Sequence, residues 1–164
     1  MKIHGSRTLA SARSAVFDAI CDPQTLLAVI PGCRSIERVG TTEYRGEIAL
    51  RLPGIVGTYR TTVRLVETDR PEHGRLEGEV VGSLGTIEGQ ATFRLTETPG
   101  NGTAVEYDGR ARISGPLARL DGRFVEGLAG TLIGQGLDNL DARLHRMYPV
   151  GVGDAGQPPK EIRE

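Results

Sequence analysis

Apolar and polar residues alternate with a period of two along most of the chain between residues 34 and 115. In five stretches one face of the segment is apolar and the other is charged: 43–52, 55–66, 75–81, 86–96 and 104–113. Turn residues such as Pro53-Gly54 separate these stretches. The pattern predicts an antiparallel meander of about six strands, with one face covered and the other in water.

Residues 2–10 also alternate, although more loosely, and predict a strand that precedes the meander. Ser11 is placed to cap a short helix that follows this strand. Asp22 and Pro23 then predict the start of a second short helix, with Asp as the cap and Pro at the first helical position. That helix is expected to end at Pro31.

The period changes after Pro116, where leucines begin to recur at helical spacing. The pattern predicts one long amphipathic helix from Leu117 to about Tyr148, which would span roughly 45 Å. The chain is therefore expected to be an α+β domain over residues 1–148, with a curved sheet of about seven strands around a long C-terminal helix. Residues 149–164 are rich in Gly and Pro and are expected to form a flexible tail.

Glycines recur on the apolar face of the predicted strands. They are Gly46, Gly57, Gly78, Gly89 and Gly109. Glycine inside a strand marks a bend or a place where something approaches the backbone closely. Two explanations remain open: the glycines only let the sheet curve around the helix, or they give curvature and also leave a cavity at its centre.

Composition and charge exclude several classes of protein. The formal net charge is −1, aromatic residues make up 4% and Trp is absent, which argues against a nucleic-acid binder. The two cysteines do not have the spacing of a zinc or redox motif. No apolar run approaches the ~20 residues of a membrane-spanning helix, and the first ten residues do not resemble a signal peptide. A cytoplasmic protein is expected.

The predicted inner face carries no acid, base or nucleophile, and His4, His73 and His145 are not at metal-ligand spacing. Neither a catalytic nor a metal site is expected, and the chain is not expected to be an enzyme. The polar groups expected to face the interior are hydroxyls, those of Tyr44, Tyr59, Tyr107 and Thr61. Hydroxyls that fix a ligand through one or two hydrogen bonds suit binding better than turnover.

The turn over residues 52–56 is unusual because four of its five residues are apolar. It is expected either to tuck under the second short helix, or to form an apolar lip at a cavity mouth that touches a membrane or a partner.

The order of elements resembles the helix-grip fold of the START-like superfamily, and the residues resemble those of the CoxG family, which accompanies carbon monoxide dehydrogenase. The segments that carry the resemblance cover about residues 2 to 148 and include Asp22-Pro23, Ile30-Pro31-Gly32-Cys33, Gly89, Gly115-Pro116-Leu117-Ala118 and Leu120-Asp121-Gly122-Arg123. The resemblance implies an accessory protein of a molybdenum-dependent carbon monoxide dehydrogenase or related hydroxylase. It also implies peripheral contact with the inner face of the cell membrane, and a respiratory quinone or similar isoprenoid lipid bound as cargo rather than as a covalent cofactor.

A ligand of this kind would lie between the sheet and the long helix. The apolar residues expected to hold its tail are Ile48, Leu50, Val63, Leu65, Leu76, Phe93, Ile113, Leu120, Phe124 and Leu128, with Tyr44 also at the site. Tyr59 or Tyr107 is expected to donate a hydrogen bond to a carbonyl of the head group. Two alternatives remain: an adaptor that tethers the dehydrogenase to the membrane, and an enzyme of the cyclase or hydrolase type, which would need a polar pocket.

Overall fold

A seven-stranded antiparallel sheet forms the body of the molecule in the computed structural model, which describes residues 1–148. Its strand order is β1-β7-β6-β5-β4-β3-β2. The strands are β1 (Lys2–Leu9), β2 (Cys33–Val39), β3 (Glu43–Leu52), β4 (Ile55–Asp69), β5 (His73–Gly82), β6 (Gly85–Thr98) and β7 (Gly102–Ser114). The helices are α1 (Arg13–Ile20), α2 (Pro23–Val29), the 3-10 helix η1 (Pro116–Arg119) and α3 (Gly122–Met147). The α+β class and the seven strands are confirmed.

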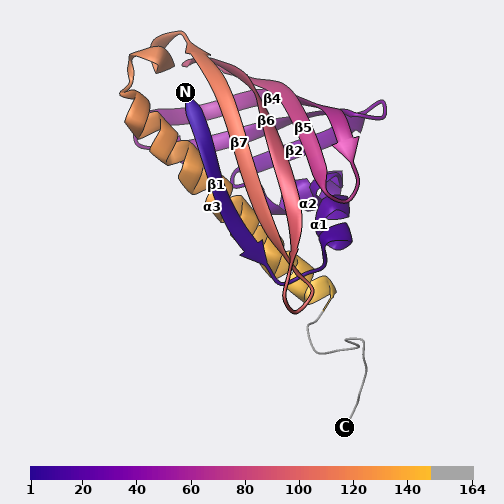
Figure 1. The fold of residues 1–164 in the computed structure, drawn as a ribbon. Coiled ribbons are helices and arrows are strands. Elements are labelled where there is room, and N and C mark those ends of the chain that lie inside the picture. Colours follow the sequence, from indigo (N-terminus) through magenta and orange to yellow (C-terminus); the bar gives the residue numbers. More distant parts are fainter. Residues whose placement is uncertain (149–164) are drawn as a thin grey trace.

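Helix α3 runs alongside the edge strand β1, while α1 and α2 lie together at one end of the curved sheet (Figure 1). Carboxylates of α3 accept hydrogen bonds from two backbone amides of this edge, Lys2 N to Glu126 Oε2 and Ala10 N to Asp141 Oδ1, both at 3.0 Å. The Asn139 amide donates to the Val29 carbonyl at 3.0 Å and ties α3 to α2. These hydrogen bonds therefore hold α3 against the β1 edge of the sheet and against the end of α2.

Close approach between backbones in the middle of the sheet requires glycine at two paired positions. Gly78 of β5 and Gly89 of β6 lie directly opposite each other in the register. A Cβ atom at Gly78 would lie 2.5 Å from the Thr62 carbonyl oxygen, and one at Gly89 would overlap the carbonyl oxygen of Arg110. Any side chain here would push the neighbouring strands apart, so these glycines permit the curvature.

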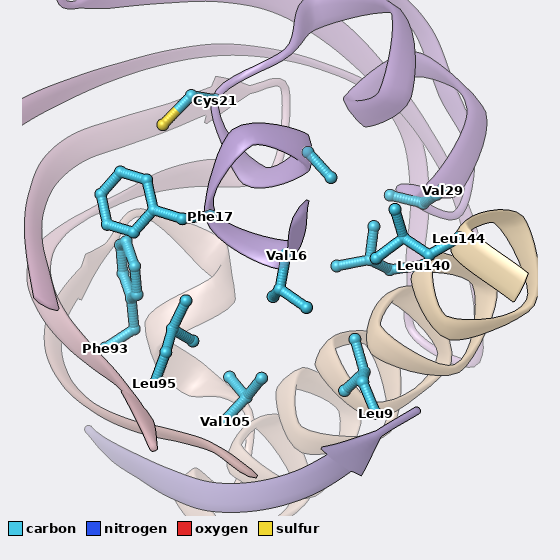
Figure 2. Packing of buried hydrophobic residues seen from close by; sticks show 11 residues of the cluster. Leu9, Val16, Phe17, Cys21, Val29, Phe93, Leu95, Val105, Leu140 and Leu144 are labelled. Carbon is cyan, nitrogen blue, oxygen red and sulfur yellow. The ribbon is translucent and has the colours of Figure 1, made fainter. Parts of the chain in front are cut away.

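The buried hydrophobic residues form two clusters rather than one. The larger cluster lies under α1, where the Phe17 and Phe93 rings pack with centroids 5.6 Å apart (Figure 2). The smaller one, centred on Ile55, Tyr59 and Leu117, lies toward the other end of the sheet. Along β6, the paired Gly89 falls between residues that belong to the two clusters.

Two local predictions about helix starts have different outcomes. The Asp22 cap is confirmed, since its carboxylate accepts from Thr25 N at 3.3 Å and from the Thr25 hydroxyl at 2.7 Å. The Ser11 cap is wrong: Ala12 holds the cap position of α1, and no side chain caps it. The Ser11 carbonyl instead accepts a 2.7 Å hydrogen bond from the Thr103 hydroxyl, which ties this turn to the start of β7.

The long C-terminal helix begins later than predicted. Pro116–Arg119 forms a separate 3-10 turn, and the chain is extended at Leu120. Asp121 then caps α3 by accepting from Arg123 N at 2.8 Å. Leu117 of this separate turn is buried in the smaller cluster. The predicted tail, residues 149–164, lies outside the described residues.

Replacement of Gly89 by Ala should lower the free energy of unfolding by about 1–3 kcal/mol, because the new methyl group meets the backbone of β7. The matched control is Gly127→Ala on α3, where a Cβ meets nothing within 4 Å. That change should raise the free energy of unfolding by about 0.5–1 kcal/mol through helix propensity. Urea denaturation of both variants measures the difference, and equal effects would contradict the close-approach argument.

Candidate functional site

An apolar cavity of about 230 Å³ lies between the middle of the sheet and α3. Strands β4 to β7 supply most of its wall, β1 supplies Ile3 and α3 supplies Ile133. The lining positions whose side chains share the inner face of the sheet are Ile3, Thr61, Val63, Leu76, Gly78, Val80, Ile87, Gly89, Ala91, Tyr107, Gly109 and Ala111.

Small residues in adjacent strands make the floor of this cavity. Gly78, Gly89 and Ala111 lie side by side in one register row across three strands, and Ala91 pairs with Gly109 in the next row. These positions bring almost no side-chain volume to the space under α3, so the helix and the sheet do not fill it. Of the two explanations for the inner-face glycines, the structure therefore favours curvature together with a cavity.

The cavity presents hydroxyls and hydrocarbon rather than charge. The Thr61 hydroxyl is already engaged, donating to the Glu79 carbonyl at 3.3 Å. Glu77, Glu79, Gln90 and Arg110 also border the cavity, but they alternate with the inward positions and belong to the opposite face of their strands. There Glu77 pairs with Arg64 at 3.2 Å and with Arg75 at 3.0 Å. Within residues 1–148 no cluster of His, Cys, Asp and Glu side chains is suited to hold a metal ion. The arrangement suits a hydrophobic ligand better than acid–base chemistry.

The predicted site residues fall into several places. Val63, Leu76 and Tyr107 line the cavity. Those that pack in or around the smaller cluster, beyond one end of the cavity, are Leu50, Tyr59, Ile113, Leu120 and Leu128. Leu65 and Phe93 belong with the larger cluster.

Three further predicted residues lie elsewhere. Ile48 pairs with Tyr59 in the register. Tyr44 is buried and engaged with the backbone, and the Phe124 side chain is 41% exposed on the first turn of α3.

Several lining residues are missing from the predicted site. Strand alternation places Val80, Ile87, Ala91 and Ala111 on the inner face, so the sequence contains the signal for them. The prediction favours large side chains, whereas the cavity exists where side chains are small. Ile133 carries no such signal, because its role depends on how α3 is rotated against the sheet.

The expectation of an uncharged inner face is wrong at the two edge strands. Arg38 of β2 stacks over the Tyr44 ring, 5.7 Å from its centroid, and donates to the Cys21 carbonyl at 2.9 Å. Arg7 of β1 lies against Gly134 of α3 and pairs with Asp138 at 3.6 Å. Both arginines have partners, and neither is among the residues that line the cavity.

The tyrosine hydroxyls differ in their surroundings. Tyr44 donates to the Cys21 carbonyl at 2.7 Å, and burial is the main cause that raises the pKa of its phenol. The Tyr107 ring lies over Gly5 of β1. Tyr59 is 2% exposed, and within residues 1–148 its hydroxyl has no hydrogen-bond partner. Burial alone raises the pKa of Tyr59.

The apolar turn between β3 and β4 packs against η1 rather than under α2. Ile55 is buried with Leu117, and Gly54 approaches Leu120, with 4.0 Å between its Cβ position and the Leu120 Cδ2 atom. Val56, next to Ile55, remains 64% exposed. The prediction that the turn tucks under the second helix is therefore wrong, and an apolar side chain remains exposed beside the smaller cluster.

A family model for CoxG, a subunit of carbon monoxide dehydrogenase, matches residues 5–145. No curated protein matches the sequence. Among solved structures, a conserved protein from Geobacillus kaustophilus is similar, with a TM-score of 0.85 and 23% identity over 89% of this chain and 96% of that one.

Two other solved structures share the fold at lower identity. One is a START superfamily protein from Mycobacterium smegmatis, with a TM-score of 0.69 and 12% identity over 89% of this chain and 98% of that one. The other is TTHA0849 from Thermus thermophilus, with a TM-score of 0.66 and 15% identity over 90% of this chain and 99% of that one. At these identities the similarity establishes the START-like fold alone.

The buried phenols should make the protein less stable at alkaline pH. The folded state holds the Tyr59 proton above the ordinary pKa of 10.0, whereas the unfolded chain loses it there. The free energy of unfolding should therefore fall as the pH rises above about 10. Tyr59→Phe should make this fall shallower. Tyr148, which is 56% exposed, provides the control substitution. Urea titrations from pH 8 to pH 11 measure the slope, and an unchanged slope in Tyr59→Phe would contradict the assignment.

Proposed function

The chain belongs to the CoxG family of carbon monoxide dehydrogenase, and from that premise we propose that it carries a lipophilic molecule, an isoprenoid quinone, for the dehydrogenase. The family and the START-like fold support a ligand-binding accessory protein of the dehydrogenase. The quinone, its delivery and a peripheral contact with the membrane are our proposal. None of the helices within residues 1–148 has the length and apolar character that a bilayer crossing requires.

The observation that carries the proposal is the apolar cavity over the paired glycines. A well-filled core would be sufficient for a protein that only joins two partners. Here an apolar cavity of about 230 Å³ lies between the two clusters. The position of Gly78 and Gly89 keeps this space open, because neither carries a side chain that could fill it.

The lining chemistry favours a quinone with a prenyl tail. Burial of each CH₂ of such a tail gains about 0.8 kcal/mol relative to water, so the tail does not cross the aqueous phase without a cover. Branched aliphatic side chains such as Val63, Val80 and Ile133 offer that cover. The ligand would be taken from the membrane and offered to the electron exit of the dehydrogenase, with the protein on the cytoplasmic side.

The two alternatives have less support. An adaptor would need no cavity, and the exposed Val56 would suffice for neither a membrane nor a protein interface on its own. An enzyme of the cyclase or hydrolase type would need an acid or base in the cavity. The charged residues that alternate with the lining positions of β4 to β7 belong to the outer face, where Glu77 pairs with Arg64 and Glu88 with Arg112.

A filled cavity should prevent binding without unfolding the protein. A leucine in place of Gly78 or Gly89 would meet neighbouring backbone. Ala111→Leu is the better change, because residue 111 lines the cavity and already bears a Cβ atom. We expect it to weaken binding of a prenylated naphthoquinone by about tenfold or more. The control is Ala142→Leu on the exposed side of α3, which makes the same chemical change outside the cavity.

Fluorescence quenching or calorimetric titration measures the affinities, and circular dichroism confirms that both variants are folded. If Ala111→Leu binds as tightly as the wild type, the ligand does not occupy this cavity. If the wild-type protein takes up no quinone and none is extracted from protein purified from a respiring host, the carrier proposal fails and the adaptor replaces it.

A further inference from the structure

The Tyr59 hydroxyl is a buried hydrogen-bond donor with nothing to donate to among residues 1–148. The ring lies over Gly82 of the neighbouring strand, where a Cβ would collide with it. Around it the buried and half-buried side chains are aliphatic, including Ile55, Leu117 and Leu128. A phenol in such surroundings loses its hydrogen bonds to water and gains none in return, which is unfavourable unless a partner arrives.

The other hydroxyls near the cavity do not share this property. Tyr44 and Thr61 already donate to the backbone carbonyls of Cys21 and Glu79. The Tyr107 hydroxyl is not among the buried polar atoms that lack a partner, and its ring covers Gly5 at the edge of the sheet. Of the three tyrosines and the threonine predicted to face the interior, Tyr59 alone combines complete burial with a free donor.

The cavity and the cluster around Tyr59 have two side chains in common. Val80 and Ile87 line the cavity and also pack against the Tyr59 cluster. Tyr59 lies two residues before Thr61 on the same face of β4, and Thr61 pairs with Val80 in the register. A ligand that fills the cavity and extends past Val80 and Ile87 therefore enters the cluster that contains the Tyr59 ring.

The size of the cavity requires such an extension. Pockets for ligands of drug size are commonly about 300–1,000 Å³, which is larger than the 230 Å³ found here. Toward Tyr59 only three residues of the neighbouring cluster are fully buried, and the side chains around them, among them Leu50, Leu120 and Leu128, are partly buried. In the opposite direction lies the larger cluster, with Phe17 and Leu95 at 0% and 1% exposure. The cavity is therefore easier to enlarge toward Tyr59.

We propose that the Tyr59 hydroxyl donates a hydrogen bond to a carbonyl oxygen of the bound ligand, whose ring lies in the smaller cluster and whose hydrocarbon tail occupies the cavity under Ile133. This assignment rests on the proposed carrier function and goes further, because it names the residue that recognises the carbonyl and separates the site of the ring from the site of the tail. It also predicts opposite effects of one substitution on the free and the loaded protein.

The experiment compares two probes of equal shape, a naphthoquinone with a short prenyl tail and the corresponding prenylated naphthalene without carbonyls. Each is titrated into the wild type, Tyr59→Phe, Tyr107→Phe, which removes the other phenol at the cavity, and the control Tyr148→Phe on an exposed side chain. The melting temperature of each ligand-free protein is also recorded. Tyr59→Phe should bind the quinone about tenfold more weakly and the hydrocarbon no more weakly than the wild type. Its melting temperature without ligand should rise, because an unpartnered buried hydroxyl is removed.

Three results would overturn the assignment while leaving the carrier function intact. They are unchanged quinone affinity in Tyr59→Phe, an equal loss of affinity for both probes, and selective loss of the quinone in Tyr107→Phe instead. A lower melting temperature of ligand-free Tyr59→Phe would show that the hydroxyl already has a partner and would also overturn it. If the wild type binds neither probe, the proposed function itself fails.

Discussion

The close approach of backbones at the paired Gly78 and Gly89 is the constraint on which the rest of the structure depends. A Cβ at either position would meet a carbonyl oxygen of an adjacent strand. Because these positions must lack side chains, the sheet can curve strongly, but its centre contributes no volume to a core. The same two residues therefore produce the curvature and the space under α3.

The divided core and the position of α3 follow from this constraint. Apolar side chains pack where the strands carry them, around Phe93 at one end and around Tyr59 at the other. Helix α3 spans both clusters, and its carboxylates accept hydrogen bonds from the backbone amides of Lys2 and Ala10, at the start of β1 and just after its end. These contacts lie outside the cavity, so a ligand can bind between α3 and the middle of the sheet without breaking them.

Strand alternation is sufficient to predict the seven strands, their buried faces and the glycines at the centre, because period two is a local property of the sequence. The cap at Asp22 is equally local. The Ser11 cap and the start of α3 differ from the prediction because tertiary partners decide them: Thr103 uses the Ser11 carbonyl, and Leu117 is buried beside Ile55. Local preference yields to such contacts.

The site is predicted only in part, for a related reason. The sequence assigns residues to faces, but it does not say which inward side chains touch one another across the sheet. Tyr44 and Tyr59 look equivalent in the pattern, yet the Cys21 carbonyl engages one hydroxyl while the other has no partner within residues 1–148. Alternation places Ala91 and Ala111 on the inner face, but only the register of three adjacent strands shows that they lie beside the paired glycines and line a cavity.

The most direct test of the account is an NMR measurement of contacts between a bound prenylated naphthoquinone and the methyl groups of the protein. The account predicts nuclear Overhauser effects from the prenyl tail to the methyls of Ala91, Ala111 and Ile133, which surround the cavity over the paired glycines. Contacts confined to methyls outside the cavity, such as those of Val56, or the absence of any contact in a sample saturated with ligand, would contradict it.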